Sequence, residues 1–182
     1  MISLPTSPTQ LSFWLPAGAP AARVIAGPCS AESPAQVIET AAALSALGIH
    51  TLRAGVWKPR SRPGSYEGAG APALEWLTAA RAATGLRLAV EVATPEHVEA
   101  ALAAGIDAVW VGARTTVNPF AVQELAEALR GTALPVMVKN PINPDLALWL
   151  GAIERLRRAG VADLAACHRG FSHAGESAYR NA

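Results

Sequence analysis

Apolar positions recur along this chain with two different periods. Short runs rich in Val, Leu and Ala, with a period of two, indicate β-strands, and longer Ala- and Leu-rich segments indicate helices. Several helical segments follow a Ser, Thr or Asn that precedes Pro, and they end near Gly, which are the usual start and stop signals. We predict strands at Val24–Cys29, Thr51–Trp57, Leu86–Ala93, Ala108–Arg114, Val136–Asn140 and Asp163–Arg169. We predict helices at Pro34–Leu47, Ala71–Thr84, Pro95–Ala104, Pro119–Leu129 and Asp145–Ala159.

Each predicted strand carries one charged or reactive residue near its carboxyl end. If that residue faces inward, the two-residue period turns an apolar row of each strand outward, toward the helices. The inward residues are then Cys29, Arg53, Glu91, Arg114, Lys139 and Arg169. Because the carboxyl ends of parallel strands meet at one edge of the fold, this repetition predicts a shared site.

Alternating strands and helices predict an α/β fold with parallel strands and right-handed crossovers. We favour a TIM-type (β/α) barrel over a doubly wound sheet, because a doubly wound sheet would gather ligands at one switch point and no Gly-rich dinucleotide or P-loop pattern occurs. A complete barrel needs about 250 residues, whereas this chain has 182. We therefore expect an irregular lead-in at residues 1–23, where Phe13 and Trp14 plug one end, and an incomplete barrel at residues 24–182 with about six of eight units.

Charge is concentrated at the predicted barrel mouth. The whole chain has a net charge of +1, so its composition does not suggest a nucleic-acid partner. Six cations against the carboxylate of Glu91 amount to about +5 at the mouth and leave about −4 elsewhere, a distribution that attracts anionic substrates. The cations are Arg53, Lys58, Arg60, Arg114, Lys139 and Arg169.

The two cysteines make no disulfide framework, and no stretch approaches the roughly 18 apolar residues of a membrane helix. We therefore expect a cytoplasmic protein with no membrane partner. We interpret the tryptophans at positions 57, 76, 110 and 149 as packing residues.

The loop after the strand at Thr51 is unusually basic and is stiffened by prolines. Arg suits bidentate contacts with phosphate or carboxylate, and Lys supplies a compact charge. A solvated basic loop is the alternative interpretation. The charged ends of the other strands favour an anion site.

Several motifs together closely resemble the metal-dependent 3-deoxy-7-phosphoheptulonate (DAHP) synthases, in particular the short bacterial subtype that is sometimes fused to chorismate mutase. The motifs are AGPCSAES (Ala26–Ser33), RAGVWKPRSRPGSYEG (Arg53–Gly68), GARTTVNPF (Gly112–Phe120), VKNPINPD (Val138–Asp145) and HRGF (His168–Phe171). The resemblance implies an aldol-like condensation of phosphoenolpyruvate with erythrose 4-phosphate that releases phosphate, the first step of the shikimate pathway.

The resemblance also implies a role for each motif. The residues that would hold the phosphate and carboxylate of phosphoenolpyruvate are Arg53, Lys58, Arg114, Lys139 and Arg169, with backbone N–H groups at Gly112 and Ala113. The run Lys58, Pro59, Arg60, Ser61 is similar to the family's KPRT, which receives the aldose phosphate. Lys58 would also donate a proton near the aldehyde oxygen. For Glu91, pairing with the mouth arginines and a catalytic or water-positioning role both stay open.

The resemblance implies a divalent metal of the Mn²⁺, Fe²⁺, Co²⁺ or Zn²⁺ class with Cys29 as a ligand. In the family a His, a Glu and an Asp complete the metal site from the last two strands, and we expect those ligands to be absent from this chain, so that its activity is impaired. We do not favour His168, His173 or Cys167 as substitutes, because His168 faces outward, His173 lies in a terminal loop and Cys167 lies deeper in the core. The resemblance further implies a homo-oligomer. Two alternatives stay open: a non-catalytic remnant that binds phosphorylated metabolites, and a sister synthase that uses arabinose 5-phosphate.

Overall fold

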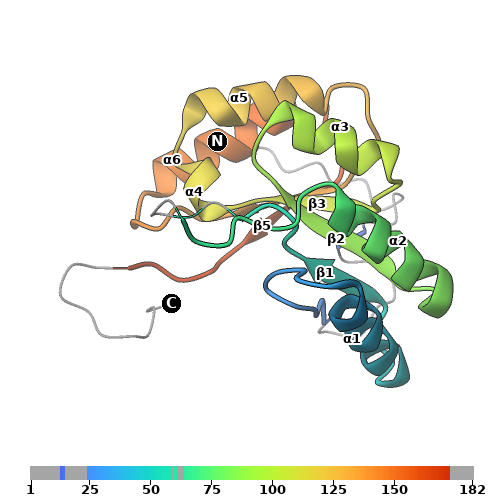
Figure 1. Cartoon of the computed structure of the whole chain (residues 1–182). Helices are drawn as coiled ribbons and strands as arrows, with labels where there is room; N and C mark the ends of the chain where they lie inside the picture. The colour runs from blue at the N-terminus through green and yellow to red at the C-terminus, as the bar shows by residue number, and fades with distance from the viewer. Residues whose placement is uncertain (1–12, 15–23, 59, 61–63, 173–182) are drawn as a thin grey trace.

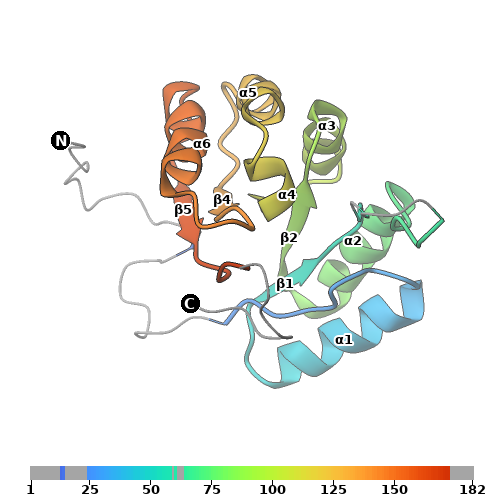
Figure 2. The ribbon, with the colours of Figure 1, turned by 90° about the vertical axis from the view of Figure 1, so that its left-hand side faces the viewer.

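The computed structural model describes residues 13–14, 24–58, 60 and 64–172. In these ranges the chain forms one sheet of five parallel strands in the order β1-β2-β3-β4-β5. The strands are β1 (Thr51–Ala54), β2 (Arg87–Val92), β3 (Ala108–Val111), β4 (Val136–Lys139) and β5 (Leu164–Cys167). The helices are α1 (Pro34–Ala46), α2 (Pro72–Thr84), α3 (Pro95–Ala103), α4 (Ala113–Thr116), α5 (Pro119–Ala128) and α6 (Leu146–Arg158). Figures 1 and 2 show the long helices following one another in an arc along one side of the sheet.

The five long helices begin and end within one residue of their predicted bounds. The first turns of α1, α3, α5 and α6 are capped as the sequence signals require, because a side-chain oxygen accepts a backbone N–H that has no partner inside the helix, whereas α2 follows Ala71 and has no side-chain cap. Ser33 accepts from the N–H of Gln36 at 3.2 Å, and Asp145 accepts from the N–H of Leu148 at 2.8 Å. In the described part of the chain, no helix is long and apolar enough to cross a membrane.

The first predicted strand, Val24–Cys29, is wrong as a strand. Only Ala26 pairs with β1, through an isolated parallel bridge in which the N–H of Arg53 donates to its carbonyl at 2.8 Å. Pro28 has no N–H to extend the ladder, so pairing does not continue beyond Ala26. The segment still runs beside β1 and delivers Cys29 to the same end of the sheet as the other strands.

Strand β3 is shorter than the predicted strand Ala108–Arg114. It ends at Val111, and the chain then turns into α4, where the N–H groups of Thr115 and Thr116 both donate to the carbonyl of Gly112. The hydroxyl of Thr116 donates to the same carbonyl at 3.0 Å. Arg114 therefore extends from a helical turn, which corrects its predicted place at the end of a strand, although it still lines the same cavity as the other inward residues.

The core lies on both faces of the sheet. Between sheet and helices, fully buried residues such as Leu52, Leu88 and Val109 pack against Leu77 and Leu125, and each such side chain contributes roughly 1.5–3 kcal/mol. A smaller cluster covers the inner face, formed by Phe13, Trp14, Ala89, Ala108 and Trp110. The predicted alternation of an outer apolar row with an inner row is confirmed by this division.

Candidate functional site

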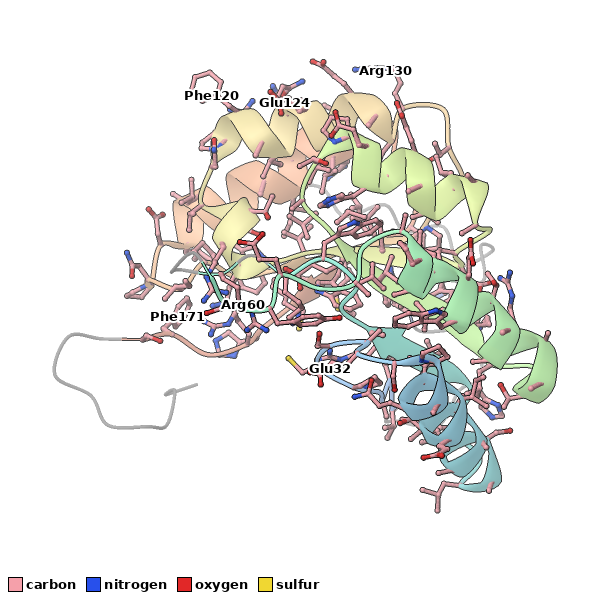
Figure 3. All side chains as sticks on the ribbon, viewed as in Figure 1. Glu32, Arg60, Phe120, Glu124, Arg130 and Phe171 are labelled. Carbon is pink, nitrogen blue, oxygen red and sulfur yellow. The ribbon has the colours of Figure 1, made fainter. Side chains whose placement is uncertain are left out.

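The charged strand ends converge on one cavity of about 450 Å³. All six residues that were predicted to face inward line it, together with backbone and side-chain atoms from the loops that follow β3, β4 and β5. The lining residues are Cys29, Arg53, Glu91, Gly112, Ala113, Arg114, Lys139, Ile142, Arg169 and Ser172. Figure 3 shows Arg60 near this end of the sheet, while Glu124 and Arg130 lie along the outer layer at α5.

Two cations of the cavity lie against the ring of Trp110. The guanidinium carbon of Arg53 is 5.5 Å from the ring centroid, and the ammonium of Lys139 is 4.8 Å from it. Arg53 also donates from Nη1 to the carbonyl of Pro28 at 3.0 Å. Burial lowers the pKa of Lys139, although the carboxylate of Glu91 opposes this shift. The cavity therefore holds its ammonium group at a cost that an anionic ligand would offset.

Glu91 is held between β3 and the start of α4. Its Oε2 accepts a hydrogen bond from the indole N–H of Trp110 at 3.1 Å. Its Oε1 occupies the space beside Gly112, where a Cβ atom would lie only 2.1 Å away. The carboxylate thus has a specific position that depends on an indole donor and on the absence of a side chain at Gly112.

Cys29 and Lys58 are in contact at one side of the cavity. The ammonium of Lys58 donates to the carbonyl of Cys29 at 2.8 Å and lies 3.3 Å from its sulfur. The hydrogen bond from Lys58 lowers the pKa of the Cys29 thiol, against the effect of burial, and the charges of Lys58 and Arg53 add to this shift. An exposed thiol beside two cations favours the thiolate, the form that binds metals and acts as a nucleophile.

The basic loop is closed by its own backbone. The N–H of Lys58 donates to Glu67 at 2.8 Å, and Nε of Arg60 donates to the carbonyl of Tyr66 at 2.7 Å. The hydroxyl of Tyr66 donates to the carbonyl of Ala31 at 3.0 Å, which ties the loop to the Cys29 segment. Pro59 and Ser61, the other two residues of the predicted aldose-phosphate motif, lie outside the described residues.

Arg169 reaches the cavity from the segment after β5. Its backbone N–H donates to the side chain of Asn140 at 2.6 Å, and the amide of Asn140 donates to Gly170 at 3.0 Å. Asn140 is fully buried, so these bonds join the ends of β4 and β5. His168 faces outward, as predicted, with its ring 6.4 Å from that of Trp149 on α6.

The chain is similar to known proteins in both sequence and structure. The sequence model described as the DAHP synthetase I family matches residues 16–182. The chain belongs to this family. The family resemblance predicted from the motifs is thereby confirmed.

A curated relative, phospho-2-dehydro-3-deoxyheptonate aldolase of Thermotoga maritima, is 34% identical over 148 residues, which cover 81% of this chain and 42% of that protein. The crystal structure of the T. maritima phospho-2-dehydro-3-deoxyheptonate aldolase (DAHP synthase) matches with a TM-score of 0.76 at 30% identity, over 87% of this chain and 45% of that one. A truncated form of 3-deoxy-D-arabino-heptulosonate 7-phosphate synthase from the same organism matches with a TM-score of 0.69 at 28% identity, over 85% of this chain and 54% of that one. The chain thus spans about half the length of these relatives, and the predicted partial (β/α) barrel is confirmed.

The DAHP synthetase I family is generally metal-dependent, and a divalent ion beside Cys29 would require several further donor atoms. Among the described residues, no three His, Cys, Asp or Glu side chains gather in a group that could hold a metal. Cys167 lines a second cavity of about 340 Å³ beside Trp110 and is half-buried, which corrects its predicted place in the core, and His173 lies outside the described residues. A single thiolate does not satisfy a catalytic ion, so these residues do not fit a complete metal site.

Trp110 is the functional neighbour that the sequence interpretation missed. It is buried in the inner cluster, as a packing residue should be, but it also contacts Arg53, Glu91 and Lys139. The signal was available, because Trp110 lies between the outward residues Val109 and Val111 and must therefore face the same side of the sheet as Glu91.

Proposed function

We propose that this chain supplies the substrate-binding part of a DAHP synthase, which condenses phosphoenolpyruvate with erythrose 4-phosphate and releases phosphate. One observation supports this most strongly. Four cations, Arg53, Arg114, Lys139 and Arg169, line a single cavity, and Glu91 is the only carboxylate that lines it among the described residues. Phosphoenolpyruvate carries a phosphate and a carboxylate close together, which requires several cations around one small volume.

In the proposed reaction, the methylene carbon of phosphoenolpyruvate forms a bond with the aldehyde carbon of erythrose 4-phosphate. Water adds at the carbon that bore the phosphate, the bond between that carbon and its phosphate oxygen breaks, and phosphate leaves. Arg53, Lys139 and Arg169 would orient the three-carbon substrate and stabilise its developing charge. Lys58 would donate a proton to the aldehyde oxygen as that oxygen becomes an alkoxide.

We assign the aldose phosphate to the loop that holds Lys58 and Arg60, with Pro59 and Ser61 completing the motif. Lys58 is anchored beside Cys29, and Arg60 is anchored by Tyr66. Backbone N–H groups of Gly112 and Ala113 are proposed as further donors to phosphoenolpyruvate. For Glu91, whose carboxylate is bonded to Trp110, we propose a role in positioning the attacking water.

We propose Cys29 as one ligand of a divalent ion of the Mn²⁺, Fe²⁺, Co²⁺ or Zn²⁺ class. Its exposure and its contact with Lys58 support a thiolate at this position. Since the described residues do not complete a metal site, no step of the reaction is assigned to the ion.

We also propose a homo-oligomer in the cytoplasm. Apolar side chains at the start of α5 and α6 support contact between copies, because Phe120 is 82% exposed and Leu146 is 59% exposed. Figure 3 shows Phe120 extending away from the ribbon at the outer end of α5. The free thiols of Cys29 and Cys167 suit a reducing compartment.

A second candidate function is binding of the phosphorylated substrates without turnover. The absence of a three-ligand metal group from the described residues favours it. The two candidates share the anion site and differ only in the chemical step.

Calorimetric titration of the chain with phosphoenolpyruvate tests the shared part. We expect binding, and Lys139→Met should weaken it about tenfold or more, the value of one charge-assisted contact. Arg130→Met removes an equal charge from an exposed turn just after α5 and should leave binding unchanged. No binding by the folded wild-type chain would overturn both candidates.

Turnover separates the candidates. Consumption of phosphoenolpyruvate with erythrose 4-phosphate and excess Mn²⁺, abolished by Cys29→Ala, would support the synthase. Binding without consumption would support the binding unit. Consumption with arabinose 5-phosphate but not with erythrose 4-phosphate would replace the proposed substrate with that of the sister synthase.

A further inference from the structure

Trp110 contacts three of the charged groups of the anion site, although its position in β3 is that of an inner core residue. Arg53 and Lys139 lie 5.5 Å and 4.8 Å from its ring centroid, and Glu91 accepts from its N–H at 3.1 Å. An indole has a negative ring face and a positive edge. Cations at the face and a carboxylate at the N–H edge therefore each meet the complementary part of the ring.

We propose that Trp110 is a positioning residue of the anion site, which holds Glu91 at its edge and the two cations at its face so that the carboxylate does not neutralise them. This inference rests on the proposed function, because it concerns the binding of an anionic substrate. Trp110 would act through Glu91, Arg53 and Lys139, without direct contact with the substrate in the proposed site.

The absence of an ion pair between Glu91 and the two cations, among the described residues, supports this proposal. Among the described residues, Glu91 has no ion pair within 4.0 Å to Arg53 or Lys139. Its charge still acts on Lys139 from a distance, since it opposes the lowering of the lysine pKa. The three groups thus share one cavity, yet the donors of Arg53 and Lys139 are not occupied by the nearest carboxylate.

The surroundings of Glu91 restrict where its carboxylate can lie. One oxygen is bonded to Trp110, and the other fills the space beside Gly112. Without the indole donor, the cations that line the same cavity, Arg53 and Lys139 among them, are alternative partners for the carboxylate. A carboxylate paired with them would compete with the carboxylate and phosphate of the substrate for the same donors.

Four variants test this inference by titration with phosphoenolpyruvate. Trp110→Phe retains a ring for the cations but loses the N–H, and Trp110→Leu loses both. We expect Trp110→Phe to weaken binding about threefold to tenfold and Trp110→Leu to weaken it further. Adding Glu91→Gln to either variant should restore most of the lost affinity, because the neutral amide cannot neutralise the cations.

The restoration distinguishes positioning from packing. If Trp110 only fills the core, the losses will be the same with and without Glu91→Gln, and the inference is overturned. Met137→Ala is the matched control, because Met137 lies beside Trp110 in register and packs on the same cluster, but has neither an N–H for Glu91 nor an aromatic ring for the cations. It should lower the melting temperature and leave binding within about twofold of wild type. A loss of binding equal to that of Trp110→Leu would overturn the inference.

A measurement without substrate separates this inference from the proposed function. In a nitrogen–proton NMR spectrum, the indole N–H resonance of Trp110, assigned from its loss in Trp110→Phe, should move in Glu91→Gln while the other indole resonances do not. An unmoved resonance overturns the inference even if phosphoenolpyruvate binds. A moved resonance, in a chain that does not bind phosphoenolpyruvate, supports the contact and overturns the proposed function.

Discussion

At the scale of single residues, Gly112 shows how a missing side chain positions a charged one. A Cβ atom at Gly112 would lie 2.1 Å from Oε1 of Glu91, the mobile end of a long side chain. Gly112→Ala should therefore displace the carboxylate at a stability cost of only about 1 kcal/mol, while phosphoenolpyruvate affinity falls several-fold. Calorimetric titration and denaturant unfolding measure the two effects.

Gly151→Ala is the matched control for this prediction, because nothing lies within 4 Å of a Cβ atom added at Gly151. It lies within α6, so the substitution should raise stability by about 0.5–1 kcal/mol through helix propensity and leave binding unchanged. Unchanged affinity in Gly112→Ala would show that the position of Glu91 is irrelevant to the substrate.

The stability of the folded chain should depend on pH through the single residue His97. Its ring stacks on Trp57 with centroids 4.0 Å apart, and Nδ1 accepts from the N–H of Ala93 at 3.2 Å. Burial lowers the pKa of His97 from 6.5, against the charge of Glu96. Because the unfolded chain binds the proton more readily, this contribution to stability is complete above pH 6.5 and is lost as the pH falls through the lowered pKa.

We therefore expect the free energy of unfolding to decrease between about pH 7.5 and about pH 5.5, and to decrease less in His97→Asn, which retains an acceptor but does not titrate. Urea denaturation at several pH values measures the slope. His50→Asn, at an exposed histidine, should keep the wild-type slope. Equal slopes in His97→Asn and wild type would exclude His97 as the source.

At the scale of elements, the loop between β1 and α2 is a closed unit. Its ends are joined by the N–H of Gly70, which donates to Val56 at 2.9 Å, and by the N–H of Lys58, which donates to Glu67. Gly68 has φ +96°, and a Cβ atom there would lie 2.1 Å from the carbonyl oxygen of Val56. Backbone atoms cannot yield as a side-chain tip can, so this contact constrains the base of the loop, where Val56 and Gly68 meet.

Gly68→Ala should consequently open the loop, destabilise the chain by more than about 1 kcal/mol and weaken erythrose 4-phosphate binding more than phosphoenolpyruvate binding. Gly64→Ala isolates the clash, since Gly64 has a similar φ of +83° but open space beside it. Titration of both variants with each substrate provides the test. Equal losses in the two variants would attribute the effect to backbone strain alone.

At the scale of the whole molecule, the described sheet presents β5 as an edge strand. Ala166 is exposed on the row that the other strands bury under helices, and in the described ranges no strand pairs with β5 on its far side. An edge with exposed backbone groups and an apolar row favours pairing between chains.

We predict that the chain associates with increasing concentration and that Ala166→Lys shifts it toward the monomer, because a lysine blunts an edge strand. Sedimentation velocity over a concentration series measures this. Ala103→Lys, at an exposed position of α3, should not change association. A monomer at every concentration would contradict both the edge contact and the proposed oligomer.

Local patterns in the sequence determined most of the elements of this protein. The caps at Ser33 and Asp145 and the two-residue alternation in β2 depend on neighbours within a few positions, so the helices and the inward row were predictable from residue order alone. The sequence motifs were sufficient to identify the family. The roles assigned to Cys29, Lys58 and the cavity cations stay predictions.

Tertiary structure alone decided the contacts that organise the site. The bond from Trp110 to Glu91 spans 19 positions, and the contact of Lys58 with Cys29 spans 29. Arg114 lies on α4 and not on the predicted strand, and only the bridge at Ala26 is present where the first strand was predicted. Such outcomes depend on which strands become neighbours and on the space between them, and a one-dimensional period contains neither distance nor volume.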